Sequence, residues 1–346
     1  MKKKTLSICL IMMASATLLF ANGKTEEKAM TPDSSGKVDL LFSTFQVGTS
    51  NYNQSAGLSQ MWLPYLPAGS TIDVQPTSPG GMGAPYLFAN HMADIAFVNG
   101  APAKWAYEKG SLGKPATQEF RALVGSMSSV SAVNFMTQSF IDKYGYDQIE
   151  DVIANKVPIR IGCSPKGSMD FQCIQLLFDY LGVTIDDIKS WGGDVVHGNG
   201  SELQAMVKDG KLDMVLDHTT SSSSNMTEIA MAKKVHFTQW KEATLDWFCN
   251  EQGFERIVLP ANSFKYQTEA VIDAGTPDCI FVAKDMPDNI AYALAKGMYE
   301  QRDELAKQYP SLGFYDPKTC WEPSKVGDVP VHPGAAQFYK EMGWMK

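Results

Sequence analysis

The sequence has 346 residues, of which 44% are hydrophobic and 20% charged, and its formal net charge is −8. This composition excludes an intrinsically disordered chain, and the length suits two domains of common size. The acidic balance repels phosphate backbones and argues against nucleic-acid binding, but it does not exclude an anionic small ligand held by local donors in a pocket.

The first segment has the pattern of an export signal. Lys2, Lys3 and Lys4 precede an apolar run over 6–19, which ends in Phe-Ala-Asn-Gly at 20–23. The run is shorter than the ~20 apolar residues that span a bilayer, so we predict a signal peptide at 1–21 that is cleaved, with an uncleaved anchor helix as the alternative. Residues 22–37 are polar and lack periodicity, which predicts a flexible leader and, with the signal, a periplasmic or other extracytoplasmic location.

Cleavage would change the charge and the cysteine count. Loss of three lysines from the 30 basic residues leaves 27 against 38 acidic ones, a net charge of −11. No C-x-x-C motif is present, so a zinc ribbon or a redox motif has no support. We expect buried, small hydrophobic side chains, with one bridged pair as an open alternative. The remaining cysteines are Cys163, Cys173, Cys249, Cys279 and Cys320.

The first half of the chain alternates strands with helices. Each predicted strand ends in a polar loop that leads into a helical pattern, which indicates a parallel α/β sheet. The predicted strands cover 38–44, 71–76 and 94–98, and the helices cover 53–65 and the surroundings of 86–88.

The second half repeats this alternation after a change at 120–136, where strand-like sequence continues without an intervening helix. Such a segment is typical of a chain that leaves one domain and enters another. The apolar strand at 279–283 is interpreted as the return crossing. The further predicted elements are strands at 158–163 and 212–216, helices at 170–181, 201–208 and 289–308, and a last helix after Pro333.

Two α/β lobes joined by two crossings predict a hinged central cleft. We place lobe 1 at 38–133 plus 284–346 and lobe 2 at 134–283, with hinge crossings near 130–136 and 279–283. Polar loops at the carboxyl ends of parallel strands face such a cleft, and open α/β sheets bind ligands there.

From 40 to 343 the sequence resembles the TAXI family, the substrate-binding proteins of tripartite ATP-independent periplasmic (TRAP) transporters. No single motif carries the resemblance, but the matching segments follow one another in the family's order and spacing. They are 41–44 with 48–52, 74–77, 93–98, 167–168, 181–184 with 186–188, 208–213 and 330–335. Three loops depart from the family pattern, at 45–47, at 169–170 and at 217–220.

The resemblance implies the type II-like fold of periplasmic binding proteins, cleft closure on a small solute, and delivery to TRAP membrane permease subunits. The solute would be an organic acid or amino acid, since known family ligands are small carboxylates such as glutamate, with other dicarboxylates among them. No catalysis or cofactor is implied, and the membrane would be reached only through the permease. The alternatives are a sensory module or surface antigen of the same fold.

Candidate ligand contacts in the first lobe lie on three loops. Ser50 and Asn51 precede a helix, so their hydroxyl, amide and backbone N–H groups suit an anion, although helix capping explains them equally well. Ser78 lies ahead of two glycines that permit close backbone approach, with an ordinary turn as the alternative. The full prediction for this lobe is Thr44, Gln46, Ser50, Asn51, Tyr52, Thr77, Ser78 and Asn99.

In the second lobe, Asp170 either caps a helix or points inward, where it would repel a carboxylate and favour an amine or hydroxyl. Arg160 either grips a carboxylate with both arms of its guanidinium or ends a strand in solvent. The full prediction for this lobe is Arg160, Gly167, Ser168, Asp170, Asp217, His218 and Thr219.

Catalysis and metal binding have little support in the sequence. Asp217 and His218 suggest a hydrolase, but neighbours in one loop do not converge as a catalytic triad, and no G-x-S-x-G motif is present. The histidines show no H-x-x-x-H spacing, so we expect no metal site.

Overall fold

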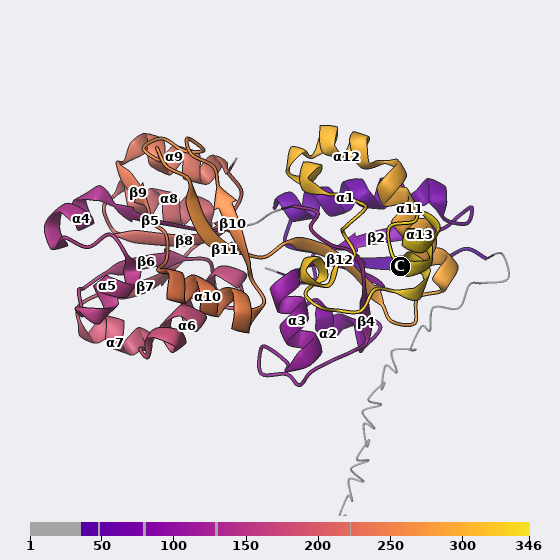
Figure 1. Ribbon diagram of the computed structural model, residues 1–346, viewed down its shortest axis with the longest axis horizontal. Coiled ribbons are helices and arrows are strands. Elements are labelled where there is room, and N and C mark those ends of the chain that lie inside the picture. The colour runs from indigo at the N-terminus through magenta and orange to yellow at the C-terminus, as the bar shows by residue number, and fades with distance from the viewer. Residues whose placement is uncertain (1–35, 48, 79–80, 129–130, 222) are drawn as a thin grey trace, which may run out of the picture.

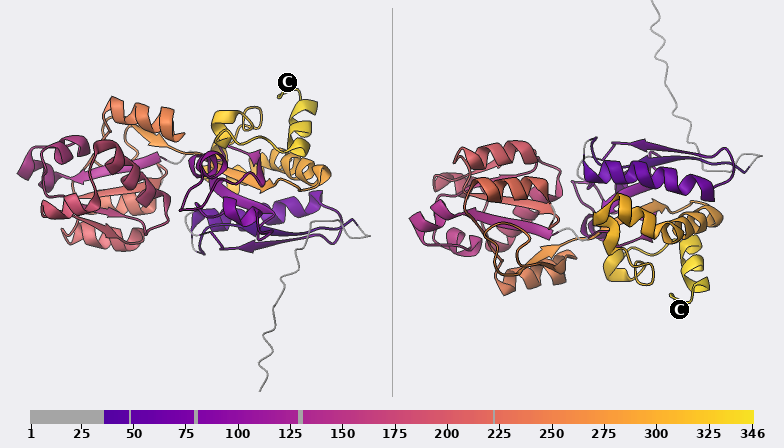
Figure 2. Two further views of the ribbon diagram at one scale, coloured as in Figure 1. Left: turned by 90° about the horizontal axis from the view of Figure 1, so that it is seen from below. Right: turned by 90° about the horizontal axis from the view of Figure 1, so that it is seen from above.

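The computed structural model describes residues 36–346 except 48, 79–80, 129–130 and 222, so the predicted signal and almost all of the predicted leader lie outside the described residues. Two α/β lobes stand side by side in all three views, joined by crossing segments (Figures 1 and 2). The prediction of a two-lobe α/β fold is confirmed. Within the described ranges, no helix is both long and apolar enough to cross a membrane.

The first sheet has the strand order β2-β1-β3-β12-β4. Strands β1, β2 and β3 are parallel, whereas β12 is antiparallel to both of its neighbours. Its strands are β1 (Asp39–Ser43), β2 (Thr71–Gln75), β3 (Ile95–Asn99), β4 (Phe120–Val124) and β12 (Asp278–Ala283). Its helices are α1 (Ser50–Trp62), η1 (Leu63–Tyr65), α2 (Pro85–Phe88), α3 (Gly100–Glu108), α11 (Asp288–Glu300), α12 (Arg302–Gln308), η2 (Pro310–Phe314), η3 (Pro323–Val326) and α13 (Pro333–Glu341).

The second sheet has the strand order β10-β11-β5-β8-β6-β7, and β9 also pairs with β5. Strand β6 is parallel to β7 and β8, and β5 runs antiparallel to β8. Its strands are β5 (Ser131–Thr137), β6 (Arg160–Cys163), β7 (Asp194–His197), β8 (Met214–Thr219), β9 (Val235–Phe237), β10 (Glu255–Leu259) and β11 (Val271–Gly275). Its helices are α4 (Gln138–Tyr144), α5 (Ile149–Ala154), α6 (Met169–Leu181), α7 (Ile185–Ser190), α8 (Gly200–Lys208), α9 (Ser224–Ala232) and α10 (Glu242–Gln252).

The central strands of the first sheet explain why its core is apolar on both faces. Every residue of β3 and β12 is buried, as continuous apolar runs require when helices cover both sides of a sheet. On one face the Trp62 indole N–H of α1 donates to the Leu294 carbonyl of α11 at 3.0 Å. This bond holds the carboxyl end of α1 against α11, and the first predicted ligand loop leads into the opposite, amino end of α1.

Two predicted element boundaries are wrong. Residues 279–283, expected to cross between the lobes, belong to β12, which lies inside the first sheet between β3 and β4. The chain therefore returns at 276–277, directly after β11. The helix expected over 289–308 is divided at Gln301, whose backbone (φ −98°, ψ 6°) separates α11 from α12.

The cysteines of the predicted mature chain are all free thiols. Four are buried, and only Cys249 is partly exposed. The open alternative of one disulfide is therefore wrong, and burial as small hydrophobic side chains describes most of them.

Candidate functional site

The first predicted loop is tied to the start of α1. Thr49 caps this helix, because its hydroxyl accepts the Tyr52 backbone N–H at 3.2 Å. Capping by Ser50 or Asn51, one of the two readings of the sequence, is therefore wrong. Ser50 is exposed, and Asn51 directs its amide toward Asp278 at 3.5 Å.

Asp278 is the centre of a buried polar cluster that the sequence did not reveal. Its carboxylate accepts the Asn99 amide at 2.7 Å and the Ser128 hydroxyl, in addition to Asn51. Ser128 lies on the first crossing, and Asp278 follows the second, so the cluster joins both crossings to the ends of β3 and α1. Burial raises the pKa of Asp278 to about 6, against the opposing effect of its three donors.

The remaining first-lobe candidates form a layer of hydroxyl groups. The Ser55 hydroxyl donates to that of Thr44, and the Thr77 hydroxyl donates to that of Ser43, both at 2.7 Å. Ser78 is 2% exposed, and its Oγ has no partner among the described residues. Gln46 is exposed, and its backbone carbonyl accepts the Thr49 hydroxyl at 2.8 Å.

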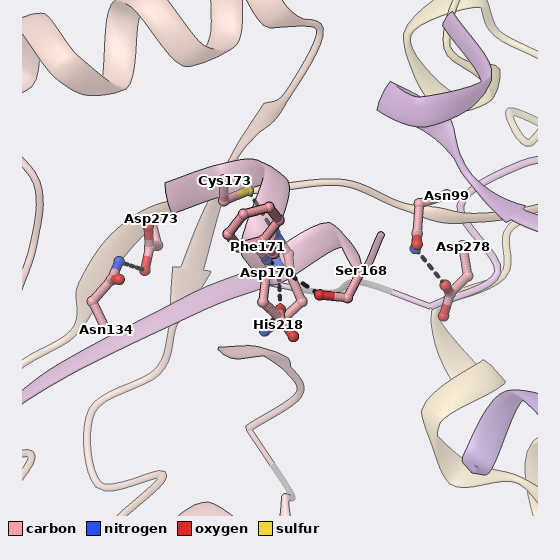
Figure 3. A network of polar contacts seen from close by, with 9 residues as sticks. All are labelled: Asn99, Asn134, Ser168, Asp170, Phe171, Cys173, His218, Asp273 and Asp278. Carbon is pink, nitrogen blue, oxygen red and sulfur yellow. Dashed lines mark hydrogen bonds and ion pairs between the residues drawn. The ribbon is translucent and has the colours of Figure 1, made fainter. Parts of the chain in front are cut away.

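In the second lobe, Asp170 and His218 form a close pair (Figure 3). One Asp170 oxygen lies 2.7 Å from His218 Nδ1 and also accepts the His218 backbone N–H at 2.6 Å. Ser168 caps α6 by accepting the Phe171 N–H at 3.2 Å, so the capping role considered for Asp170 is wrong. Burial alone would raise the pKa of Asp170, but the bonds from His218 hold it below its usual value.

The histidine of this pair also contacts a thiol, since His218 Nε2 lies 3.4 Å from Cys173 Sγ. Aspartate, histidine and cysteine thus stand in the order of a nucleophilic triad. The thiol is fully buried, however, and burial together with Asp170 and Asp273 raises its pKa well above the usual value. A thiol that stays protonated and covered is a poor nucleophile, so this geometry does not favour a hydrolase.

Asp217 does not take part in this triad. Successive strand residues point to opposite faces, so Asp217 and His218 diverge on β8. Among the described residues, the Asp217 carboxylate makes no hydrogen bond or ion pair, and burial and the charge of Asp170 raise its pKa well above the usual value. The neighbouring candidates Gly167 and Thr219 lie in the loop before α6 and at the end of β8.

Arg160 is bound far from these loops. Its guanidinium contacts both oxygens of Asp213, at 2.7 and 2.6 Å, and the Gly210 carbonyl at 2.9 Å. These contacts are at the amino end of β6, whereas the loop that leads to Asp170 follows its carboxyl end. The expectation that Arg160 grips a ligand carboxylate in the cleft therefore disagrees with its position. A cavity of about 220 Å³ beside it is lined by Lys233 and Lys234 among others.

The lobes contact each other next to the two polar clusters. The Trp105 indole of α3 donates to the Gln252 carbonyl at 2.8 Å, and its ring centroid lies 6.0 Å from that of Phe254. Met82 of the first lobe is also buried in the apolar cluster that contains Phe171. Burial has the largest effect on the pKa of Asp278 and raises it, and the influence of His218 from the other lobe is the smallest of the opposing effects.

Five of the predicted residues lie in these two clusters, namely Asn51, Asn99, Ser168, Asp170 and His218, but the sequence analysis did not predict several of their partners. Cys173 had a usable signal, because it follows Asp170 by three residues and therefore shares its helix face. The signal for Asp278 was weaker: it is the acidic first residue of an otherwise apolar strand. No three His, Cys, Asp or Glu side chains in the described part of the chain group as a metal site.

Comparison with known proteins places this architecture in a family. The model of the NMT1-like family matches residues 42–343. Among solved structures, MatC from Rhodopseudomonas palustris with bound malate is 14% identical, covering 88% of this chain and 97% of that chain, with a TM-score of 0.49. An R. palustris protein with adipate is 13% identical (88% and 97%, TM-score 0.48), and the periplasmic aliphatic sulphonate binding protein SsuA from Escherichia coli is 10% identical (88% and 84%, TM-score 0.43). Because the family model spans nearly all of the described residues, this chain belongs to the NMT1-like family.

Proposed function

We propose that this chain is an extracytoplasmic solute-binding protein that captures a small polar solute between its lobes and delivers it to a transporter of the TRAP type. The observation that carries the proposal is the placement of two polar clusters on facing lobes. Asp278 with its amide and hydroxyl donors lies on one side, and Asp170 with His218 lies on the other (Figure 3). Ligand sites in α/β proteins form where such loops converge.

The crossings supply the mechanism. The chain passes between the lobes after β4 and again at 276–277, and the Ser128 hydroxyl donates to Asp278 between these two places. A solute that touches both lobes stabilises the arrangement in which they are close, and it does so by as much as its contacts differ between open and closed forms. Binding of this kind requires no bond to be made or broken, which agrees with the buried, protonated thiol of Cys173.

The names of solved structures add context for the solute. MatC is described with malate, another protein with adipate, and SsuA as a sulphonate binder. These are small polar molecules, and the solute that we propose for this chain is also small and polar. The TRAP assignment rests on the ordered segments that resemble the TAXI family, and its permease partners follow from it.

The test begins with native mass spectrometry of freshly purified protein, followed by denaturing extraction of any bound molecule. We expect a copurified small solute, or else a solute that raises Tm in a screen. Small-angle scattering should then show a smaller radius of gyration when that solute is added. The solute-binding function is wrong if no compound that raises Tm compacts the protein. TRAP delivery is tested separately, by transport of the solute into vesicles that carry the permease with and without this protein.

A further inference from the structure

The ring of Phe254 lies between the contact of the two lobes and the polar pair of the second lobe. Its centroid is 6.0 Å from that of Trp105 in the first lobe and 6.3 Å from that of His218 in the second. Both separations are in the range at which aromatic rings contact each other. Among the described residues, Trp105 and His218 make no ring contact with each other, so Phe254 is the ring that joins them.

Phe254 is packed so that its ring does not move independently. Phe254 and Trp105 are each 4% exposed, and the fully buried ring of Phe248 packs edge-on against Phe254 at a centroid distance of 5.2 Å. The Phe254 backbone N–H also donates to the Phe248 carbonyl at 3.2 Å. Because protein interiors are close-packed, a displacement of one ring is passed to the rings against it. A shift of Trp105 therefore changes the surface that Phe254 presents to His218.

Trp105 is placed so that it follows the movement of the lobes. The helix that carries it, α3, begins at the second crossing, where the Ala101 backbone N–H donates to the Thr276 hydroxyl at 2.9 Å. Trp105 lies about 6 Å farther along the helix axis, at 1.5 Å per residue. Its indole N–H donates at 2.8 Å to the carbonyl of Gln252, on the turn that carries Phe254. A rotation of the lobes at the crossing consequently moves Trp105 against this turn.

The imidazole of His218 is held by two polar contacts within the second lobe. Nδ1 lies 2.7 Å from an Asp170 oxygen, and Nε2 lies 3.4 Å from Cys173 Sγ (Figure 3). Both of these partners belong to α6. The contact with Phe254 adds a third constraint on the same ring, and it is the one that leads to the first lobe.

We propose that Phe254 is a positioning residue that links the lobe junction to the candidate site. It passes a displacement of Trp105 to the His218 imidazole, so the separation of the lobes sets the orientation of His218 toward Asp170. This inference goes beyond the proposed function, because the coupling is present without a solute. A ring cluster that served stability alone would lower the free energy of unfolding when truncated, but it would not make the effect of Trp105 on His218 depend on Phe254.

The experiment is NMR of the purified protein with ¹³C-labelled histidines and no added solute. The sequence has five histidines, and His218→Gln assigns the imidazole signal of His218 by its loss. We expect Trp105→Ala to shift the His218 signal, and at least about half of this shift to be lost when the same substitution is made in a Phe254→Leu background. Comparison within each background removes the direct effect of the Phe254 ring on the signal.

The matched control is Tyr107→Ala on the same helix, because the Tyr107 ring packs on Phe120 of the first sheet, 5.6 Å away, instead of on the second lobe. It should leave the His218 signal unchanged. Trp105→Phe keeps an aromatic ring and should shift the signal in the same direction by less, so it tests the proposal even if Trp105→Ala folds poorly. The proposal is overturned if neither Trp105 variant moves the His218 signal, if Tyr107→Ala moves it as far, or if the shift is as large in the Phe254→Leu background. None of these results bears on solute binding, which copurification and scattering test separately.

Discussion

At the scale of single residues, the free-energy cost of burying a charge is clearest at Asp278. Asp278 is held by three side-chain donors, yet burial still raises its pKa from 3.8 to about 6. The shift means that folding favours the neutral carboxyl group. A carboxylate retained under that cost is more consistent with a role in binding than with one in stability.

The pH dependence of unfolding should show this cost. Because burial raises the folded-state pKa of Asp278, the folded protein holds the proton of this carboxyl group more tightly than the unfolded chain does. The resulting contribution to the free energy of unfolding is full below pH 3.8 and is lost as the pH rises through about 6. Asp278→Asn should therefore be more stable than the wild type at neutral pH, by up to about 3 kcal/mol. The difference should vanish near pH 4 in urea denaturation without ligand. A difference that does not change with pH would show that Asp278 does not titrate in this way.

The sequence predicted the residue types at the site better than their contacts. Asp170 and His218 are 48 positions apart, and Asn99 and Asp278 are 179 apart, so no local pattern links them. The polar loops were predictable because Gly, Ser and Asn break strands and begin helices. Arg160 was predicted to bind the carboxylate of a ligand, but the carboxylate that it binds belongs to Asp213 of the same chain. The sequence pattern gave no way to distinguish these two partners.

At the scale of elements, the alternation of strands and helices predicted most of the first sheet. Fully apolar runs such as β3 and β12 were visible, because strands covered on both faces read as continuous hydrophobic segments. The antiparallel pair of β10 and β11 was missed, since β10 mixes charged with apolar residues and is only partly buried. The role of β12 was misjudged because an apolar strand does not reveal which sheet it joins.

The packing of α13 against α11 leads to a prediction at this scale. A Cβ at Gly334 would lie 2.0 Å from the Asp288 carbonyl oxygen, so the two helices would have to move apart. Gly334→Ala should lower the free energy of unfolding by about 1–3 kcal/mol. The control Gln337→Ala, at an exposed position of the same helix, should change it by less than about 0.5 kcal/mol. Chemical denaturation measures both, and equal values would contradict the close approach.

At the scale of the whole molecule, the contact of Trp105 with Gln252 and Phe254 holds the lobes together beside the crossings. Trp105→Ala removes the indole N–H donor and most of the apolar contact, so the lobes should separate more readily. We expect a larger radius of gyration in small-angle scattering of the unliganded variant. Trp105→Phe keeps an aromatic ring and should lie between the variant and the wild type. No change in either variant would show that the crossings alone set the separation.

The position of β12 in the middle of the first sheet also governs the order in which the molecule is completed. Residues 131–275 supply every strand of the second sheet, so that lobe is whole while the chain is still being made. The first sheet, in contrast, has a gap between β3 and β4 until β12 emerges. Its exposed strand edges must wait through about 150 residues of synthesis, a period in which unpaired edges invite association. Demand for chaperones during biogenesis should therefore come from the first lobe, although its sequence begins first.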